Sequence, residues 1–166
     1  MNDSRVAPAG SRREGRERVL GLLYEAESKS IPLDELVDGL PLPLTGYAAR
    51  LVEGIGHDPA RLDHLIEAVS HRWRVARMPA VDRAVLRMAT HELAERQDVP
   101  AGAVISEAVD LAAEYSTEAS SRFVNGVLAR LATELRPNEA TDIEVPELAD
   151  PGDAVRAVAV SELSTE

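Results

Sequence analysis

The chain has no cysteine, few aromatic residues and no long apolar run. Without cysteine it forms no disulfide bond and offers no thiolate to a metal ion. Its aromatic content of 3% favours packed helices over a β-sandwich. No apolar stretch approaches the roughly 20 residues that span a bilayer, and the polar beginning of the chain lacks the apolar segment of a signal peptide. These absences predict a cytoplasmic protein with a helical core and no membrane partner.

The acidic charge is unevenly distributed along the 166 residues. The chain has 29 acidic and 18 basic residues, a net charge of -11. Residues 137–166 hold eight acids and one arginine, which leaves 21 acids and 17 bases, a net charge of -4, in residues 1–136. The first 18 residues hold five arginines against three acids. A basic end of this kind either meets an anion or is the solvated start of a helix.

Apolar residues recur every three or four positions in most segments, and this spacing predicts amphipathic helices. No segment alternates with the period of two that is typical of a strand. We therefore expect an all-α fold, a single-domain bundle of about seven helices. Caps and prolines set the expected helices at 12–28, at 33–37, after Thr45, after Asp58-Pro59, after Pro79, after Pro100, and from Thr117 or Ser120 to Leu135.

The two ends of the chain differ from this helical region. Residues 1–10 have no periodicity, and residues 137–166 hold three prolines among acids. Both compositions predict disorder, although residues 154–163 are apolar enough for a transient helix. Ser11 followed by Glu14 predicts a capping box at the first helix. We therefore expect a helical domain over 11–136 between a disordered N-terminus, 1–10, and an acidic, disordered tail, 137–166.

Patterns typical of catalysis or of metal binding are missing. His91-Glu92 resembles the start of a zinc-protease helix, but the fourth residue after His91 is Glu95 rather than a second histidine. His64 and His71 would lie two helical turns apart, about 10 Å, which is too far to share one metal ion. No glycine-rich phosphate loop and no Gly-x-Ser-x-Gly turn is present. The sequence predicts no enzymatic activity, no cofactor and no metal site.

One segment of the last expected helix departs from a plain amphipathic pattern. Phe123-Val124-Asn125-Gly126-Val127-Leu128 contains the only phenylalanine of the chain and two weak helix formers, Asn125 and Gly126. A local packing or binding demand would account for them. By spacing alone, Gly126 could let a neighbouring helix approach while Asn125 bonds to a loop, or the segment could contact a ligand.

Four motifs, in this order and spacing, resemble the NusB family of bacterial transcription antitermination factors, in its actinobacterial form. The resemblance covers about residues 11–136 and implies the all-α NusB fold and a non-catalytic, RNA-binding protein of ribosomal-RNA synthesis. The motifs are Arg12-Arg13-x-x-Arg16 with Leu23-Tyr24, Val81-Asp82-Arg83-Ala84-Val85-Leu86-Arg87 with Glu92-Leu93, Asp98-Val99-Pro100 with Ile105-Ser106-Glu107-Ala108-Val109-Asp110-Leu111-Ala112, and the segment from Phe123 to Leu128.

The resemblance also implies partners. NusB pairs with NusE, a small-subunit ribosomal protein, and the pair binds boxA, a single-stranded RNA element in ribosomal-RNA leader transcripts. Other Nus factors and RNA polymerase complete the antitermination complex. The apolar surface that NusE needs could instead be buried in a homodimer, and the sequence leaves both arrangements open.

Matched positions imply the RNA-binding residues. Arg12, Arg13 and Arg16 would meet the RNA backbone, because arginines bind phosphates. Phe123 would offer a base-facing surface, since an aromatic ring can stack on an unpaired base, and Asn125 would lie beside it. The alternative for Phe123 is packing in the core.

Two further matched positions imply the surface that faces NusE. Asp82 lies between Val81 and Val85, so it could point outward beside a buried stripe, and Tyr24 would lie on the same surface. The alternative for Tyr24 is the core. The alternative for Asp82 is an ion pair with Arg83 or Arg87.

Three other functions remain open. The same fold guides a ribosomal-RNA cytosine methyltransferase, of which the chain would be a fragment. A protein-interaction module with weak or no RNA binding is another alternative, because Glu14, Ser106, Ala119 and the acidic tail depart from the family pattern. A small enzyme is the third. Retained NusE binding without RNA binding would favour the interaction module.

Overall fold

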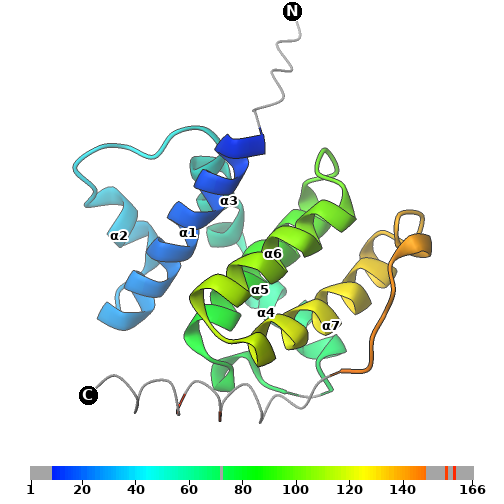
Figure 1. Cartoon of the computed structure of the whole chain (residues 1–166). Helices are drawn as coiled ribbons and strands as arrows, with labels where there is room; N and C mark the ends of the chain where they lie inside the picture. Colours follow the sequence, from blue (N-terminus) through cyan, green and yellow to red (C-terminus); the bar gives the residue numbers. More distant parts are fainter. Residues whose placement is uncertain (1–8, 72, 149–155, 157–158, 160–166) are drawn as a thin grey trace, which may run out of the picture.

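The computed structural model describes residues 9–71, 73–148, 156 and 159 (Figure 1). In these ranges it has seven α-helices, two short 3-10 helices and no strand, which confirms the expected all-α bundle. None of the described helices is long and apolar enough to cross a membrane. The elements are α1 (Ala9–Lys29), α2 (Leu33–Asp38), α3 (Gly46–His57), α4 (Pro59–Val69), η1 (Val75–Arg77), α5 (Ala80–Glu95), α6 (Ala101–Tyr115), α7 (Glu118–Leu135) and η2 (Ala140–Asp142).

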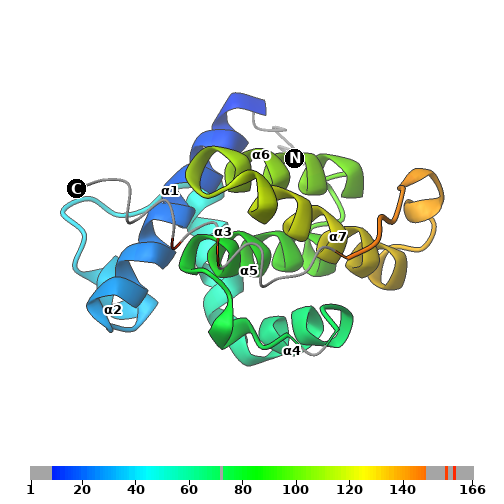
Figure 2. The same ribbon diagram turned by 60° about the horizontal axis from the view of Figure 1, so that its bottom comes forward.

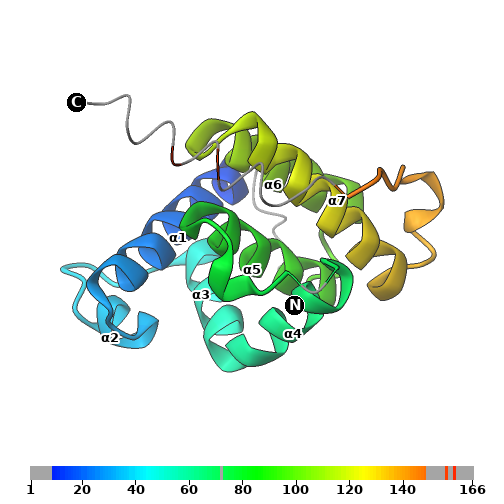
Figure 3. The same cartoon turned by 90° about the horizontal axis from the view of Figure 1, so that it is seen from below.

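Helix α5 lies at the centre of the bundle. It packs against α1, α3, α4, α6 and α7, and α4 and α6 lie on opposite sides of it (Figures 2 and 3). Its inward residues repeat every three or four positions, and Val85, Leu86, Ala89 and Leu93 are at most 1% exposed. Because helices cover α5 from several directions, some of its polar residues are also enclosed, including Asp82 and Glu92.

The helix starts follow the sequence signals only in part. Asp58 accepts a hydrogen bond from the Arg61 amide at 3.0 Å, as expected for a cap before Pro59. Thr117, rather than Ser120, caps α7 by accepting a bond from the Ser120 amide at 3.0 Å. Thr45 precedes α3 but makes no capping hydrogen bond through its side chain.

The helical region extends beyond the expected boundary at the N-terminal end. Helix α1 begins at Ala9, inside the segment 1–10 that was expected to be disordered. Ser11 therefore lies within the first turn and not before it, so the expected capping box is replaced by helix. Residues 1–8 lie outside the described residues.

Part of the acidic tail lies against the helical bundle in the described residues. After α7 the chain turns back beside this helix (Figure 1), and Ile143 and Leu148 pack against the core. A Cβ added at Gly126 would lie 3.1 Å from Cδ1 of Leu148. Gly126 thus accommodates the returning C-terminal segment and not a neighbouring helix. The expectations for residues 149–155, 157–158 and 160–166 lie outside the described residues.

Arg136 joins the end of α7 to the end of α5. Its guanidinium is buried and donates to the carbonyl oxygens of Glu92 at 2.7 Å, Leu93 at 2.8 Å, Arg96 at 2.7 Å and Val99 at 2.5 Å. These carbonyls belong to the last turn of α5 and to the loop that follows, where a helix leaves carbonyl groups without a full set of helical partners. The oxygens of Glu92 and Arg96 also accept from the amides of Arg96 and Val99. The clamp therefore fixes the loop that carries Arg96 and Asp98.

Candidate nucleic-acid interface

The arginine-rich start of α1 does not present three free cations. Arg16 is 3% exposed, and its Nε and Nη2 lie 3.0 and 2.9 Å from Oε1 of Glu92 on α5. Burial acts to lower the pKa of Arg16, but the hydrogen bond and charge of Glu92 outweigh it, so the pKa is raised. The expected contact of Arg16 with an RNA backbone is therefore not available, because its side chain is enclosed and neutralised within the bundle.

Arg13 is half-buried among carboxylates. Its guanidinium nitrogens lie 3.0 Å from Glu17, 3.4 Å from Glu107 and 2.6 Å from Glu114. The last two acids belong to α6, so these ion pairs join α1 to α6. Three acids around one cation leave no positive charge in excess at this point. The surface around Arg13 is thus not the basic patch that the sequence suggested.

The basic character gathers instead around the ring of Tyr47, on α3. The guanidinium carbons of Arg12, Arg16, Arg50 and Arg96 lie 6.0, 5.4, 5.8 and 5.3 Å from the centre of this ring. This is the range in which a cation is attracted by an aromatic face. The four arginines come from α1, α3 and the loop after α5, so the fold assembles a cluster that no local motif contains.

A hydrogen bond to Glu92 holds the hydroxyl of Tyr47 in place. Its hydroxyl donates a short hydrogen bond to Oε1 of Glu92, the carboxylate that also binds Arg16. Burial raises the pKa of Tyr47, and the neighbouring charge of Glu92 raises it further. The phenol therefore stays protonated and keeps its ring fixed beneath the arginines.

The outer arginines of this cluster keep an excess of positive charge. Asp98 binds Arg96 at 2.8 Å and lies 3.6 Å from Arg12, so one carboxylate serves two cations. Arg96 holds the pKa of Asp98 down, at about 2. Arg50 is exposed, and no ion pair involves it within the described residues. We call Arg12, Arg50 and Arg96 the basic face. Sequence reasoning missed Arg50, Arg96 and Tyr47, although Arg50 follows Tyr47 by one helical turn.

Phe123 and Asn125 occupy different environments on α7. Phe123 is 1% exposed and belongs to the hydrophobic core, which is the alternative to its expected base-facing role. A base-facing role is not available to a ring enclosed in this way. Asn125 is half-buried and reaches the surface in part.

Tyr24 and Asp82 also differ in their exposure to solvent. Tyr24 on α1 is 49% exposed, one of the few large side chains with apolar surface that are open to solvent in the described part of the chain. Asp82 is 0% exposed, so its expected outward orientation is not found. The reason is that the turn between α6 and α7 covers the first turn of α5. Neither expected ion pair forms, because Arg83 binds Glu27 and Arg87 binds Asp63.

The environment of Asp82 is unusual for a carboxylate. Neither of its oxygens has a hydrogen bond of ordinary geometry, although the hydroxyls of Ser120 and Ser116 approach it. Burial raises the pKa of Asp82, and these hydroxyls oppose the rise. Burial of this kind shifts a carboxyl group toward its neutral form relative to an exposed aspartate.

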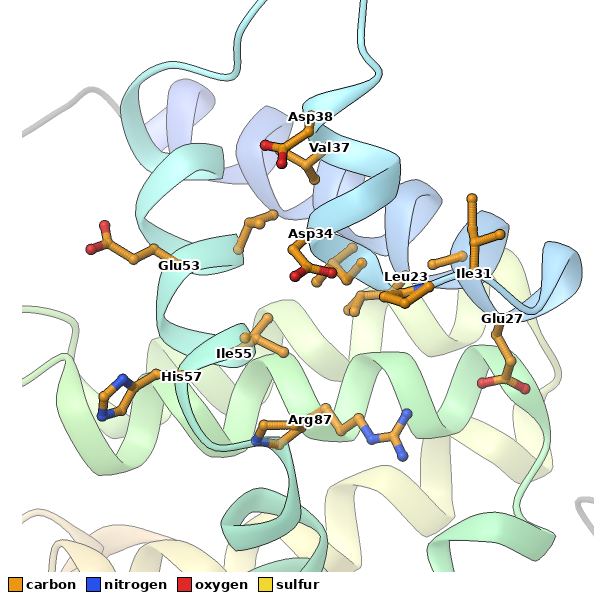
Figure 4. Close-up of a pocket in the computed structure, with 16 residues that line it drawn as sticks. Leu23, Glu27, Ile31, Asp34, Val37, Asp38, Glu53, Ile55, His57 and Arg87 are labelled. Atoms are coloured by element: carbon orange, nitrogen blue, oxygen red, sulfur yellow. The ribbon is translucent and has the colours of Figure 1, made fainter.

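A second feature is an apolar hollow of about 860 Å³ between α1, α2, α3 and the start of α4. Leu23, Ile31, Val37 and Ile55 line it, and charged side chains such as Arg87 stand at its edges (Figure 4). No serine, threonine, cysteine or lysine lines it. The described residues also contain no cluster of acids and imidazoles that could hold a metal ion.

Comparisons with known proteins agree with this fold. The model of the NusB family matches residues 13–133. The transcription antitermination protein NusB of Kineococcus radiotolerans is 44% identical over 126 residues, covering 74% of this chain and 93% of the relative. The structure of T. maritima NusB is 34% identical with a TM-score of 0.70, covering 78% of this chain and 95% of that one. A chain from a complex of the antitermination factors NusB and NusE with double-stranded RNA shares the fold, with a TM-score of 0.64 at 24% identity over 76% of this chain and 98% of that one.

Proposed function

Because this chain belongs to the NusB family, we propose that it is a transcription antitermination factor that binds boxA RNA in ribosomal-RNA leader transcripts together with NusE. It acts in the cytoplasm, without enzymatic activity, in a complex with other Nus factors and RNA polymerase. The observation that carries the proposal is the basic face on a chain of this family. Residues 11–136 supply the binding domain, and the acidic segment 137–166 modulates it.

The basic face supports RNA binding by its charge and by its rigidity. Arg12, Arg50 and Arg96 are held around one ring, so little side-chain freedom is lost when they meet phosphates. Arg12 is the residue of the arginine-rich opening that we assign to RNA contact. Arg16 contributes indirectly. It binds the carboxylate of Glu92, which in turn accepts the hydrogen bond of the Tyr47 hydroxyl. Arg13 could contact RNA only by leaving carboxylates of α6, and Asn125 stays a candidate contact on α7.

The exposed side of α1 supports the partner assignment. Tyr24 offers an aromatic ring that is half open to solvent, and aromatic residues are enriched at the centres of protein interfaces. Three residues later, Glu27 binds Arg83 of α5, so Tyr24 lies on a surface that two helices stabilise. We assign Tyr24 to NusE binding. Asp82 would act there only indirectly, by holding the turn between α6 and α7. A homodimer through the same surface is the competing arrangement.

Titration of a boxA-like RNA at two salt concentrations, with and without NusE, tests the proposal. Neutralising about three phosphates of a single strand gives a log–log salt slope near -2. We expect Arg12→Ala to raise Kd several-fold and to flatten this slope. Arg18→Ala is the matched control, because Arg18 is an exposed arginine of the same helix on another face.

The outcomes separate the candidate functions. Equal effects of Arg12→Ala and Arg18→Ala, or no binding of boxA-like RNA by the wild-type pair, would overturn the proposed RNA contact. Retained NusE binding in that case would favour the protein-interaction module, which the carboxylates around Arg13 support. Loss of NusE binding on Tyr24→Ala, with an unchanged melting temperature, would support the partner surface. Sedimentation of the free protein distinguishes the monomer from the homodimer.

A further inference from the structure

A second hollow adjoins the basic face. It has a volume of about 550 Å³ and lies between α3, the start of α4 and the end of α5. Arg50 and Arg96 belong both to this hollow and to the basic face. We call it the Arg50 pocket. Its other lining residues are Glu53, Gly54, His57, Asp58, Arg61, Leu62, His91 and Glu95.

Most charges of the Arg50 pocket are already engaged. Arg61 binds Glu95 at 2.7 Å, and Asp58 caps α4. Arg96 is held by Asp98 and by the ring of Tyr47. Arg50 has no ion pair within the described residues, although Glu53 follows it by one turn. It is therefore the guanidinium at the rim of the pocket that is free to take an anion.

The floor of the pocket is formed by His91 and Gly54. A Cβ added at Gly54 would lie 2.1 Å from Cε1 and 2.2 Å from Nε2 of His91, so the imidazole fills the place of a side chain at position 54. His91 is 7% exposed, and it lines the pocket with the small part that remains open. Burial lowers the pKa of His91 despite the charges of Glu92 and Glu95. A neutral imidazole at this floor can exchange a hydrogen bond with an uncharged polar edge.

We propose that the Arg50 pocket binds one unpaired nucleotide of the bound RNA, with its phosphate at Arg50 and its base against His91. The inference rests on the proposed function. It adds a binding site for a base, which the basic face alone does not supply. Single-stranded RNA is recognised through splayed bases, and pockets of this volume enclose small molecules. Because Arg50 belongs to both surfaces, a strand whose phosphates follow the basic face passes the mouth of the pocket.

The phosphate part of the inference is tested by replacing Arg50. We expect Arg50→Ala to raise the Kd for a boxA-like single strand several-fold and to reduce the magnitude of the salt slope by about 0.7. Arg50→Lys should retain most of the affinity, since it keeps the charge. Arg77→Ala is the matched control, because Arg77 is an exposed arginine before the opposite end of α5. It should leave Kd unchanged.

The base part of the inference is tested with strands in which each nucleotide in turn lacks its base. The imidazole resonances of His91 in the wild-type protein report occupancy of the floor. We expect the intact strand to shift them, and one abasic position to abolish the shift while its neighbours retain it. If no abasic position changes the His91 signal, the pocket holds phosphate at most and the inference is overturned.

The failure of this inference differs from that of the proposed function. Equal Kd values for Arg50→Ala and Arg77→Ala, together with weakened binding by Arg12→Ala, would overturn the Arg50 pocket and leave RNA binding in place. Loss of all effects, including that of Arg12→Ala, would overturn both. Thermal melts of the Arg50 variants complete the test, because a change at this exposed side chain should leave the fold intact.

Discussion

At the scale of single residues, Arg16 shows how a side chain of the arginine-rich motif serves the core. Arg16 and Glu92 are both nearly inaccessible to solvent and bind each other. We expect Arg16→Ala to lower the free energy of unfolding by about 3–5 kcal/mol, because it leaves the Glu92 carboxylate buried without its cation. Arg12→Ala, at a partly exposed ion pair, should cost less than about 1 kcal/mol. Urea denaturation of the two variants measures the difference. Similar losses would contradict the assigned roles.

Replacing Asp82 is expected to stabilise the protein, whereas replacing Arg16 is expected to destabilise it. Its folded-state pKa is raised by burial, so the folded protein binds more protons than the unfolded chain between about pH 3.9 and the raised pKa. The contribution of Asp82 to stability therefore falls as pH rises through this window and stays unfavourable at neutral pH. We expect Asp82→Asn to raise the melting temperature at pH 7 by a few degrees. The two proteins should converge as pH falls below the raised pKa. A lower melting temperature for Asp82→Asn at pH 7 would show that the carboxylate is stabilising.

These residues also show that a sequence motif does not determine whether its side chains are buried or exposed. The sequence identified Arg16, Asp82 and Phe123 as members of motifs, but all three are enclosed in the structure. Helical spacing assigns a residue to a face, and only the packing of other elements decides whether that face is covered. Arg16 meets its partner 76 positions away along the chain. Arg50 and Arg96 join the basic face through Tyr47. The spacing of Tyr47 and Arg50 on one helix was a local signal, but no local pattern links them to Arg12 and Arg96.

At the scale of elements, the sequence predicted helices well and connections less well. The periodicity located seven helices, and the Asp58-Pro59 and Thr117 signals set two of their starts. The capping signal at Ser11 placed the start of the first helix too late, because α1 begins at Ala9. After α7, isolated apolar residues such as Leu148 pack against the core, which the composition of the tail did not indicate. Disorder is predicted from mean composition, and two apolar contacts are too few to change that mean.

The contact between Gly126 and Leu148 predicts different effects for two substitutions. Alanine is favoured over glycine in a helix by about 1 kcal/mol, and its Cβ would meet the flexible end of Leu148 at 3.1 Å. We expect Gly126→Ala to change the unfolding free energy by less than about 1 kcal/mol. Gly126→Val adds branched carbons on the same side, so it should displace residues 143–148 and raise their rate of proteolysis. Equal proteolysis of the two variants would indicate that Leu148 does not depend on the space above Gly126.

At the scale of the whole molecule, the chain combines an acidic net charge with a basic surface. The net charge of -11 repels RNA at long range, whereas the basic face attracts phosphates at short range. Salt screens the long-range part first, because the Debye length is about 10 Å at 0.1 M. Within residues 137–148, Ile143 and Leu148 pack against the core, and Glu139 accepts a hydrogen bond from the Ala101 amide at 2.8 Å. A cut at Pro137 would therefore disturb the fold, and a cut after Leu148 is the cleaner test of the tail.

Residues 149–166 hold four acids and one arginine, a net charge of -3. A tethered polyanion competes with phosphate at a high effective concentration. We expect removal of residues 149–166 to raise the affinity for a boxA-like RNA at low salt and to change it less at high salt. The matched control keeps the length of the chain and replaces Asp150, Asp153, Glu162 and Glu166 by their amides. If charge is the cause, the control should reproduce the gain, since both proteins lose the same four carboxylates. A gain from truncation that the amide variant lacks would indicate that the tail acts by occupying space. If neither protein gains affinity, the tail has no effect on RNA binding and the prediction is wrong.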